Sequence, residues 1–263
     1  MILVAGGTGR LGTLVVRRLA GRGLAVRVLT RDPARAQHLG DAAAELVVGD
    51  VRDRASVERA MRGVSTVVSA VQGFAGPGRV TPESVDRDGN ANLVDAAAGA
   101  NADVVMVSVV GASPDSPMEL FRAKYAAEQH LRAGGVPWTI VRATAFLELW
   151  TEILGKGMVF GRGNNPINFV SVHLVAAAVD SAVINPGLRG RTLEIGGPDN
   201  LTFNQLAADV QRGRGQTKSI RHIPLWLLRT MAPVSRQAAA AVAMDTIDLT
   251  FAASSDRMAE ASL

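Results

Sequence analysis

The chain has 263 residues, of which 48% are hydrophobic, so it can bury a full core. It contains no cysteine and only four histidines without paired spacing, which excludes disulfides and thiolate metal sites and argues against any metal site. The net charge is +4, and because the basic residues are scattered, we predict no nucleic-acid partner.

The first 12 residues are an apolar run and a glycine-rich turn, followed by apolar positions at helical spacing. This order predicts a strand, a phosphate loop and a helix, the first half of a dinucleotide-binding unit. We expect Gly7 to allow a tight turn, Gly9 to leave room for a pyrophosphate and Gly12 to bring helix and strand together, with helical N–H groups facing the anion. The candidate cofactor-binding residues here are Gly6, Gly7, Thr8, Gly9, Arg10, Leu11 and Gly12.

A second apolar run, residues 24–30, predicts a strand that ends at Arg31. In dinucleotide-binding folds an acid near this position binds the ribose of NAD, whereas an arginine accommodates the 2′-phosphate of NADP. NADP(H) is therefore favoured over NAD(H), with Arg10 as a second candidate cation. Two alternatives stay open: Arg31 caps a surface turn before Pro33, or Asp32 serves NAD.

The alternation of strand and helix continues, with strands predicted at residues 45–48 and 66–71 and a helix at 53–62. Asp50 and Val51 follow the first of these strands, where an adenine lies in this fold. Ala70 and Val71 end the second strand and are expected on the other side of the nucleotide. The alternative for Asp50 is an N-cap of the helix that follows.

Residues 72–80 contain three glycines and a proline, which predicts a mobile loop over the site. A long helix is predicted over residues 82–100, with Asp86 and Asn90 on one face.

The fifth strand, residues 103–109, contains Ser108, which is a candidate to bond a substrate oxygen or, alternatively, a packed hydroxyl. The next helix, residues 117–133, carries Lys124, one of three lysines among 28 basic residues. An amine can donate to ribose hydroxyls or shuttle a proton, so Lys124 and Ser108 are the candidate catalytic residues. The alternative for Lys124 is a solvated side chain that pairs with Glu128 one turn later.

After a sixth strand at residues 138–141 the alternation loosens. We therefore divide the chain into a dinucleotide-binding Rossmann core, residues 1–145, and a mixed segment, residues 146–263, that returns one helix and one strand to the sheet and forms a small lobe over its carboxyl edge. The predicted elements of this segment are a helix at 146–154, two short strands flanking the turn at 161–166, a helix at 172–184, a strand at 191–195 and helices at 203–212, 225–231 and 238–251. The fold class is α/β, a doubly wound parallel sheet with a small substrate-side lobe.

Several motifs resemble the atypical short-chain dehydrogenase/reductase superfamily and, within it, the NmrA-like group. They are Gly-Gly-Thr-Gly-Arg-Leu-Gly at 6–12, Thr-Arg-Asp-Pro at 30–33, Gly-Asp-Val at 49–51, Val-Ser-Val-Val-Gly-Ala at 107–112, Lys124 with Glu128, Thr-Ile-Val-Arg-Ala at 139–143, Phe-Val-Ser-Val-His from 169 and Ile-Gly-Gly-Pro-Asp-Asn-Leu-Thr from 195. The resemblance spans nearly the whole chain and implies NAD(P) binding.

One departure concerns the proton donor. Typical members of the superfamily carry Tyr-x-x-x-Lys, in which the tyrosine protonates the substrate carbonyl and the lysine holds the nicotinamide ribose. Leu120 occupies the tyrosine position here, and Tyr125 lies about 100° round the helix from Lys124. NmrA-like proteins commonly lack the tyrosine, and they include redox-sensing regulators as well as reductases.

The first functional hypothesis is an oxidoreductase that passes hydride from NADPH to a small apolar or aromatic acceptor such as a quinone or conjugated carbonyl. Candidate walls of its pocket are Phe74, Phe146, Trp150 and Phe160.

Two other hypotheses stay open. One is a non-catalytic NADP(H) sensor that acts through a protein partner. The other is a structural nucleotide-binding subunit near a membrane complex, indicated by the aromatic, apolar and cationic stretch at 220–234, which is alternatively a lid on the lobe. Because Met1 leads directly into the first strand and no long uncharged stretch is present, we expect a cytoplasmic protein without stable membrane insertion.

Overall fold

The computed structural model of the chain describes residues 1–74, 80–215 and 220–252. Residues 75–79, within the predicted loop over the site, lie outside the described residues, as do 216–219 and 253–263.

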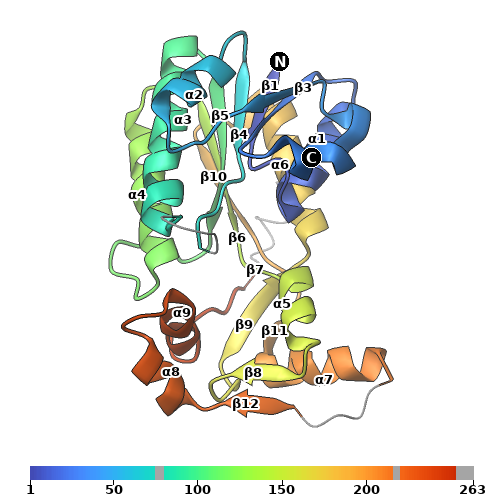
Figure 1. Ribbon diagram of the computed structural model, residues 1–263, viewed down its shortest axis with the longest axis vertical. Coiled ribbons are helices and arrows are strands. Elements are labelled where there is room, and N and C mark those ends of the chain that lie inside the picture. Colours follow the sequence, from blue (N-terminus) through green and yellow to red (C-terminus); the bar gives the residue numbers. More distant parts are fainter. Residues whose placement is uncertain (75–79, 216–219, 253–263) are drawn as a thin grey trace.

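A seven-stranded parallel sheet forms the centre of the fold (Figure 1). Its strands are β1 (Ile2–Ala5), β2 (Val26–Thr30), β3 (Glu45–Val48), β4 (Thr66–Ser69), β5 (Asp103–Val109), β6 (Trp138–Ala143) and β10 (Arg191–Ile195), in the spatial order β10-β6-β5-β4-β1-β2-β3. The chain builds outward from β1 through β3 and then crosses back to add β4 on the other side of β1. Ligands bind beside such a reversal in doubly wound sheets. The predicted α/β fold is confirmed.

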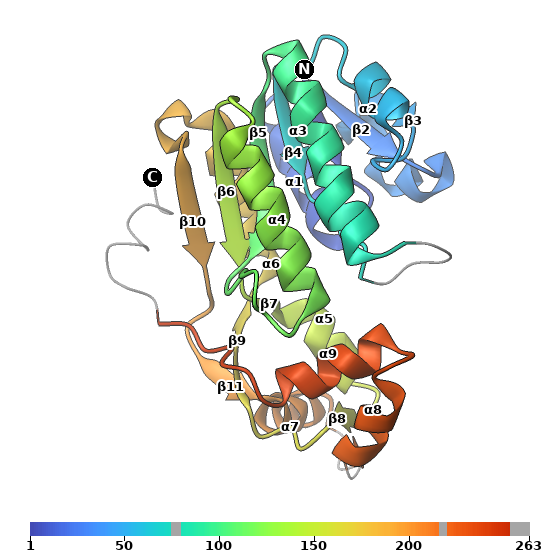
Figure 2. The same cartoon turned by 90° about the vertical axis from the view of Figure 1, so that its left-hand side faces the viewer.

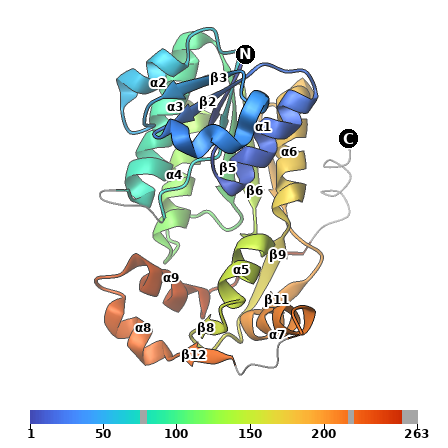
Figure 3. The ribbon, with the colours of Figure 1, turned by 45° about the vertical axis from the view of Figure 1, so that its right-hand side comes forward.

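Helices cover both faces of the sheet (Figures 1 and 3). One face carries α1 (Arg10–Gly21), the 3₁₀ helix η1 (Pro33–Ala42) and α6 (Val172–Ile184); the other carries α2 (Arg54–Ala60), the π-helix η2 (Pro82–Arg87), α3 (Asp88–Ala100) and α4 (Glu119–Ala133); a short 3₁₀ helix, η3 (Pro186–Leu188), precedes β10. Each layer buries its own apolar cluster against the sheet. Between α1 and α6, Arg22 donates two hydrogen bonds of 2.8 Å to the buried carboxylate of Asp180. This pair fixes how the phosphate-loop helix sits beside its neighbour.

The C-terminal part also builds a lobe at the carboxyl ends of the strands (Figure 2). Its elements are β7 (Ala145–Phe146), α5 (Leu147–Leu154), β8 (Met158–Phe160), β9 (Pro166–Val170), β11 (Asn200–Thr202), α7 (Phe203–Gly213), β12 (Arg221–Ile223), α8 (Leu225–Met231) and α9 (Arg236–Met244). A third apolar cluster holds them together, and within it Trp150 stacks on Phe203 with ring centroids 4.6 Å apart. The predicted small C-terminal lobe is therefore present.

The two short strands predicted to flank residues 161–166 are present as β8 and β9; β8 pairs with β12, and β9 pairs with β11 and β7. Two local predictions differ from the structure. The helix predicted at 82–100 opens with the π-helical turn η2. The last helix ends at Met244 rather than at residue 251, because its continuation is bound by other segments. Asn165 Nδ2 donates to the carbonyls of Met244 and Ile247, and the Asn168 N–H donates to the carbonyl of Leu249.

Asn168 on β9 joins the lobe to the sheet. Its fully buried side chain accepts hydrogen bonds from the Gly197 N–H at 2.8 Å and the Thr144 hydroxyl at 2.9 Å, and donates to the Gly197 carbonyl at 3.1 Å. Thr144 follows β6 and Gly197 follows β10. One amide therefore satisfies polar groups at the ends of two neighbouring sheet strands.

Replacing this amide tests the junction. We expect Asn168→Ala to lower the free energy of unfolding by about 2–4 kcal/mol, because the Gly197 N–H and the Thr144 hydroxyl lose a buried acceptor. Urea unfolding measures the loss. Asn164→Ala is the matched control: this exposed residue accepts one bond, from Asn204, and should cost less than about 1 kcal/mol. Equal losses in the two variants would show that Asn168 is no junction.

Candidate cofactor-binding and active site

The turn after β1 has no space for side chains at two of its glycines. Gly6 has a φ of +84°, and a Cβ there would lie 2.5 Å from the carbonyl oxygen of Ala70. A Cβ on Gly12 would collide with the carbonyl oxygen of Gly6. The left-handed turn thus lies at Gly6 and not, as expected, at Gly7, where a Cβ would instead press on the side chain of Val28. The close helix-to-strand contact at Gly12 is as expected.

The same turn leaves an open cradle of N–H groups at the start of α1. Gly9 is the N-cap and has no side chain to cap the helix, and a Cβ there would approach only the Gly6 carbonyl oxygen, at 3.3 Å. The N–H groups of Arg10, Leu11 and Gly12 have no acceptor within the helix. The first turn of α1 also contains no acidic residue. These features fit the pyrophosphate of a dinucleotide.

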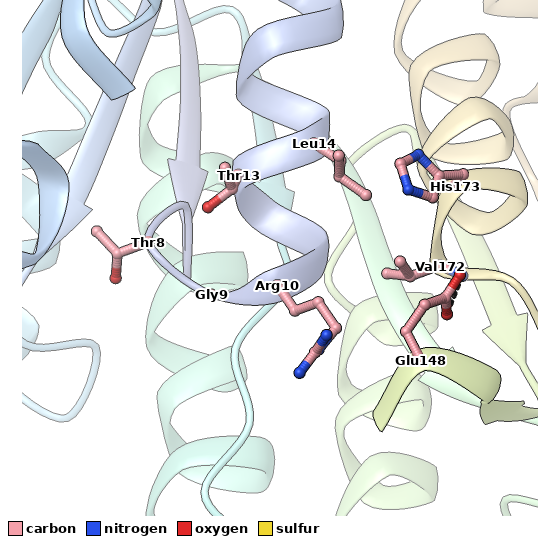
Figure 4. A pocket seen from close by; sticks show the side chains of 8 residues that line it. All are labelled: Thr8, Gly9, Arg10, Thr13, Leu14, Glu148, Val172 and His173. Carbon is pink, nitrogen blue, oxygen red and sulfur yellow. Dashed lines mark hydrogen bonds between the residues drawn. The ribbon is translucent and has the colours of Figure 1, made fainter. Parts of the chain in front are cut away.

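A pocket of about 440 Å³ opens beside this cradle (Figure 4). Its lining comes from the phosphate loop, α1, α5 and the start of α6: Thr8, Gly9, Arg10, Thr13, Leu14, Glu148, Val172 and His173. The guanidinium of Arg10 donates to Glu152 of α5 at 2.6 Å. Arg10 is therefore engaged by α5, which does not support its expected role as a second cation beside Arg31.

Glu148 in this pocket closes the N-terminus of α6 (Figure 4). Its carboxylate accepts from the Ser171 hydroxyl at 2.7 Å and from the Val172 N–H at 2.9 Å. Partial burial raises the pKa of Glu148, but these hydrogen bonds outweigh it, so the pKa lies below its ordinary value. The ionised carboxylate of Glu148 thus stabilises the N-terminus of α6.

At the other side of the loop, Arg31 follows β2 and is exposed. The turn before Pro33 is capped by Asp32, which accepts from the Ala34 N–H, and not by Arg31. Arg31 lies close enough to Asp50 to help lower the pKa of its carboxyl. This leaves the guanidinium of Arg31 available to an anion that arrives from solvent.

Asp50 and Val51 lie at the end of β3, as predicted. The carboxylate of Asp50 binds Arg52, with a shortest distance of 2.7 Å. Burial raises the pKa of Asp50, but the hydrogen bonds and the positive charge of Arg52 lower it further, so the pKa of Asp50 lies below its ordinary value. The N-cap of α2 is Asp53, which rules out that alternative for Asp50. Val51 is buried, and its carbonyl accepts from Asn92.

Lys124 is buried, with 4% of its surface exposed, and its ammonium contacts three oxygens. These are the carbonyls of Val71 and Val107 and the Oδ1 atom of Asp86, each at 3.0 Å. The alternative prediction for Lys124, a solvated side chain that pairs with Glu128, is therefore wrong. The ammonium donates hydrogen bonds to the two carbonyls, whereas its contact with Asp86 Oδ1 is an ion pair in which this buried oxygen accepts no hydrogen bond.

Asp86 was placed on a helix face by the sequence, but no pattern indicated its role. It is fully buried at the π-helical turn η2, and its Oδ2 accepts from the Gly73 N–H at 2.7 Å. Burial raises its pKa, against the opposing effect of Lys124 and of the Gly73 N–H. Asp86 and Lys124 together hold the segment from Val71 to Gly73, which follows Ala70 at the sheet reversal.

Ser108 is buried near the carboxyl end of β5 and donates to Glu128 Oε1 at 2.6 Å. Arg142 binds the same carboxylate through two bonds, of 2.6 and 2.9 Å, and Arg132 adds a third. This placement corresponds to the packed hydroxyl of the alternative, not to a group that meets a substrate. Ser108 is thus part of a buried polar network between β5, β6 and α4.

The four candidate aromatic walls are not gathered in one place. Trp150 belongs to the lobe core against Phe203, and Phe160 lies in β8, which pairs with β12 in the lobe (Figure 1). Phe146 lies in β7 and packs partly on the sheet cluster, while Phe74 is half-buried.

Comparison with known proteins identifies the family. A family model described as NAD(P)H-binding matches residues 6–186, more than half of the chain. The chain belongs to this NAD(P)H-binding family. The family assignment predicted from the motifs is confirmed.

Two sequence relatives and one solved structure are similar to this chain. The (4-alkanoyl-5-oxo-2,5-dihydrofuran-3-yl)methyl phosphate reductase of Streptomyces griseus is 32% identical over 236 residues, which cover 88% of this chain and 79% of the relative. An NAD(P)H azoreductase of Xenophilus azovorans is 28% identical over 86% of this chain and 78% of its own length. The structure of an NADPH-dependent quinone oxidoreductase of Escherichia coli superposes with a TM-score of 0.77 at 22% identity, over 95% of this chain and 91% of that one, and so shares the fold.

Within this family's fold, Leu120 is the most consequential side chain of α4. It is buried one helical turn before Lys124, at the position where the superfamily pattern places its tyrosine. Tyr125 is half-buried on a different face of the helix. In the described structure no hydroxyl on α4 thus takes the place of the missing donor.

The pKa of Glu148 leads to a test by acid. Because this pKa is lower in the folded protein than in the unfolded chain, its stabilisation is full above the unfolded value and is lost as the pH falls through the folded one. We expect the unfolding free energy to fall more between pH 5 and pH 2.5 in the wild type than in Glu148→Gln, as urea titrations would measure. Glu152→Gln, an exposed carboxyl on the same helix, is the control and should follow the wild type.

Proposed function

We propose that this protein is an NADPH-dependent reductase that delivers hydride to a small, electron-poor conjugated acceptor such as a quinone or a conjugated carbonyl. The observation that carries the proposal is an intact phosphate loop combined with a buried leucine, Leu120, where the superfamily places its acid. When bound, NADPH supplies the hydride. An acceptor that spreads the resulting negative charge over several atoms can take its proton from water, so it needs no strong acid beside it.

The relatives support this substrate class. Their names describe a reductase of an alkanoyl dihydrofuranone phosphate, an azo compound reductase and a quinone oxidoreductase. A dihydrofuranone of that name, an azo compound and a quinone all contain conjugated bonds next to electronegative atoms. A small apolar or aromatic acceptor of this chemistry is the proposed substrate here.

The cofactor is proposed to lie along the carboxyl edge at the β1–β4 reversal. The pyrophosphate binds the N–H groups at Gly9 and the first turn of α1, and Asp50 and Val51 border the adenine. Arg31 pairs with the 2′-phosphate, which favours NADP(H). Ala70 and Val71 lie on the other side of the nucleotide.

Lys124 is proposed to position the site and not to donate a proton. Its ammonium binds the Val71 and Val107 carbonyls, and its partner Asp86 binds the Gly73 N–H. These contacts fix the backbone on which one side of the nucleotide rests. A buried ammonium that donates to two backbone carbonyls and pairs with a buried carboxylate is held in place as a positioning group.

The cofactor assignment is tested by calorimetric titration with NADPH, NADP, NADH and NAD. We expect Arg31→Ala to weaken binding of the two phosphorylated nucleotides by about 1–3 kcal/mol and to leave the other two nearly unchanged, because only the 2′-phosphate loses its partner. Arg59→Ala, an exposed arginine on α2, is the matched control. Equal weakening of all four nucleotides by Arg31→Ala would contradict the assignment.

The reductase activity is tested by NADPH oxidation with a panel of quinones, azo dyes, conjugated lactones and simple ketones. We expect turnover with the conjugated acceptors and none with simple ketones, whose alkoxide product requires an acid beside it. Saturable NADPH binding without turnover of any acceptor would instead favour the nucleotide sensor, and no binding at all would favour the structural subunit.

A further inference from the structure

The charges of the C-terminal lobe are unevenly distributed along the chain. Between Asp209 and Asp245 there is no acidic residue, whereas the same stretch holds six cations: Arg212, Arg214, Lys218, Arg221, Arg229 and Arg236. Since the whole chain has a net charge of +4, the remainder carries a net charge of −2. The basic residues are scattered along the chain, but the excess of positive over negative charge lies in this one segment because it contains no acid.

Large apolar side chains are exposed in the same segment. Trp226 on α8 is 67% exposed, Met231 is 45% exposed, and Val234, just after the helix, is 89% exposed. Leu228 is the buried residue of α8 and lies about 200° round the helix from Trp226. The indole therefore points away from the lobe, so packing of α8 as a lid does not account for it.

Two of the cations beside these side chains have no acidic partner. In the described ranges, Arg221 on β12 and Arg229 on α8 are exposed and form no ion pair, whereas Arg236 binds Glu119 at 3.0 Å and Arg212 binds Asp209. Figures 1 and 3 place β12 and α8 in the part of the lobe farthest from the sheet. We call Arg221, Trp226, Arg229, Met231 and Val234 the α8 surface.

We propose that the α8 surface docks the protein onto a bilayer that contains anionic lipid. Tryptophan and aliphatic side chains insert at the headgroup boundary, and unpaired arginines attract the negative headgroups. None of the helices in the described ranges is long and apolar enough to cross a bilayer, so the contact is peripheral. This inference is independent of the proposed reductase activity.

The charges and the exposed apolar side chains of the α8 surface favour a bilayer over a second copy of the chain or a nucleic acid. A second copy of the chain would bring two acid-free cationic segments together, which repel each other. Duplex DNA would match the cations but would leave the exposed Trp226 and Val234 without a partner, because its bases are already stacked and paired. A bilayer with anionic headgroups satisfies both the apolar and the charged side chains at once.

The orientation also follows from the fold. Arg236, at the start of α9, binds Glu119 at the start of α4, which links this end of the lobe to the sheet domain. A bilayer on the α8 surface would contact the lobe and leave the outer helices of the sheet in solvent (Figure 2).

The experiment is co-sedimentation of the full chain with vesicles of phosphatidylcholine, with and without phosphatidylglycerol, while tryptophan fluorescence is recorded. We expect binding only with phosphatidylglycerol, weakening with salt, and a blue shift that is absent in Trp226→Phe. The double variant Arg221→Gln with Arg229→Gln should bind about 20-fold more weakly. Arg59→Gln and Val48→Ser, an exposed arginine and a 60% exposed valine on the sheet domain, are the controls and should bind like the wild type.

Several results would overturn the proposal. They are absence of vesicle binding, equal binding to phosphatidylcholine alone, or equal weakening by the control variants. Self-association that Trp226→Ser abolishes in a chain that binds no vesicles would assign the surface to a second copy. Binding of duplex DNA that displaces the vesicles but persists in Trp226→Ser would assign it to nucleic acid. Because no nucleotide or acceptor is present in these measurements, their outcome does not depend on catalysis.

Discussion

The architecture depends on one close approach of backbone to backbone. Gly6 lies against the Ala70 carbonyl, and Gly12 lies against the Gly6 carbonyl, so β1, α1 and the end of β4 meet without any intervening side chain. A methyl group at either glycine would push these segments apart, and the positive φ of Gly6 adds a conformational cost for any other residue. This contact fixes the start of α1, with its open N–H groups, beside the sheet reversal between β1 and β4.

The buried pair of Lys124 and Asp86 stabilises the segment that follows β4 at the sheet reversal. Removing two charges from water is costly, and a buried ion pair gives net stability only when the remaining donors and acceptors are satisfied. Here Val71 and Val107 accept from the ammonium and the Gly73 N–H donates to Asp86 Oδ2, whereas Asp86 Oδ1 accepts no hydrogen bond and has only the ion pair with Lys124. We infer that the pair is useful because it specifies geometry: it joins α4, η2, the end of β5 and the segment after β4. The π-helical turn at η2, a feature often found near functional sites, is what brings Asp86 to Lys124.

Elements with a strong periodic signal could be predicted from the sequence, and residue contacts largely could not. The strands at 45–48, 103–109 and 191–195 and the helices at 172–184 and 225–231 have the expected bounds, because apolar periodicity and turn residues mark their ends locally. The end of the last helix was wrong because Asn165 and Asn168, some 80 residues earlier in the chain, bind its continuation. For the same reason, burial of Lys124 against Asp86 and of Ser108 against Glu128 depends on pairs distant in sequence, which no motif spacing reports.

The internal partners of the polar side chains restrict the chemistry that this site can perform. Ser108 donates to Glu128, the Glu128 carboxylate is shared with two arginines, and Lys124 donates to two carbonyls and pairs with Asp86. Each group would have to leave a buried partner before it could protonate a substrate, and a buried polar group without a partner costs about 1–3 kcal/mol or more. With Leu120 in place of the tyrosine, a proton from water is the less costly route. Under the proposed reductase function, such a site would discriminate among acceptors by their own ability to hold charge, and the protein would contribute mainly the position of the nucleotide.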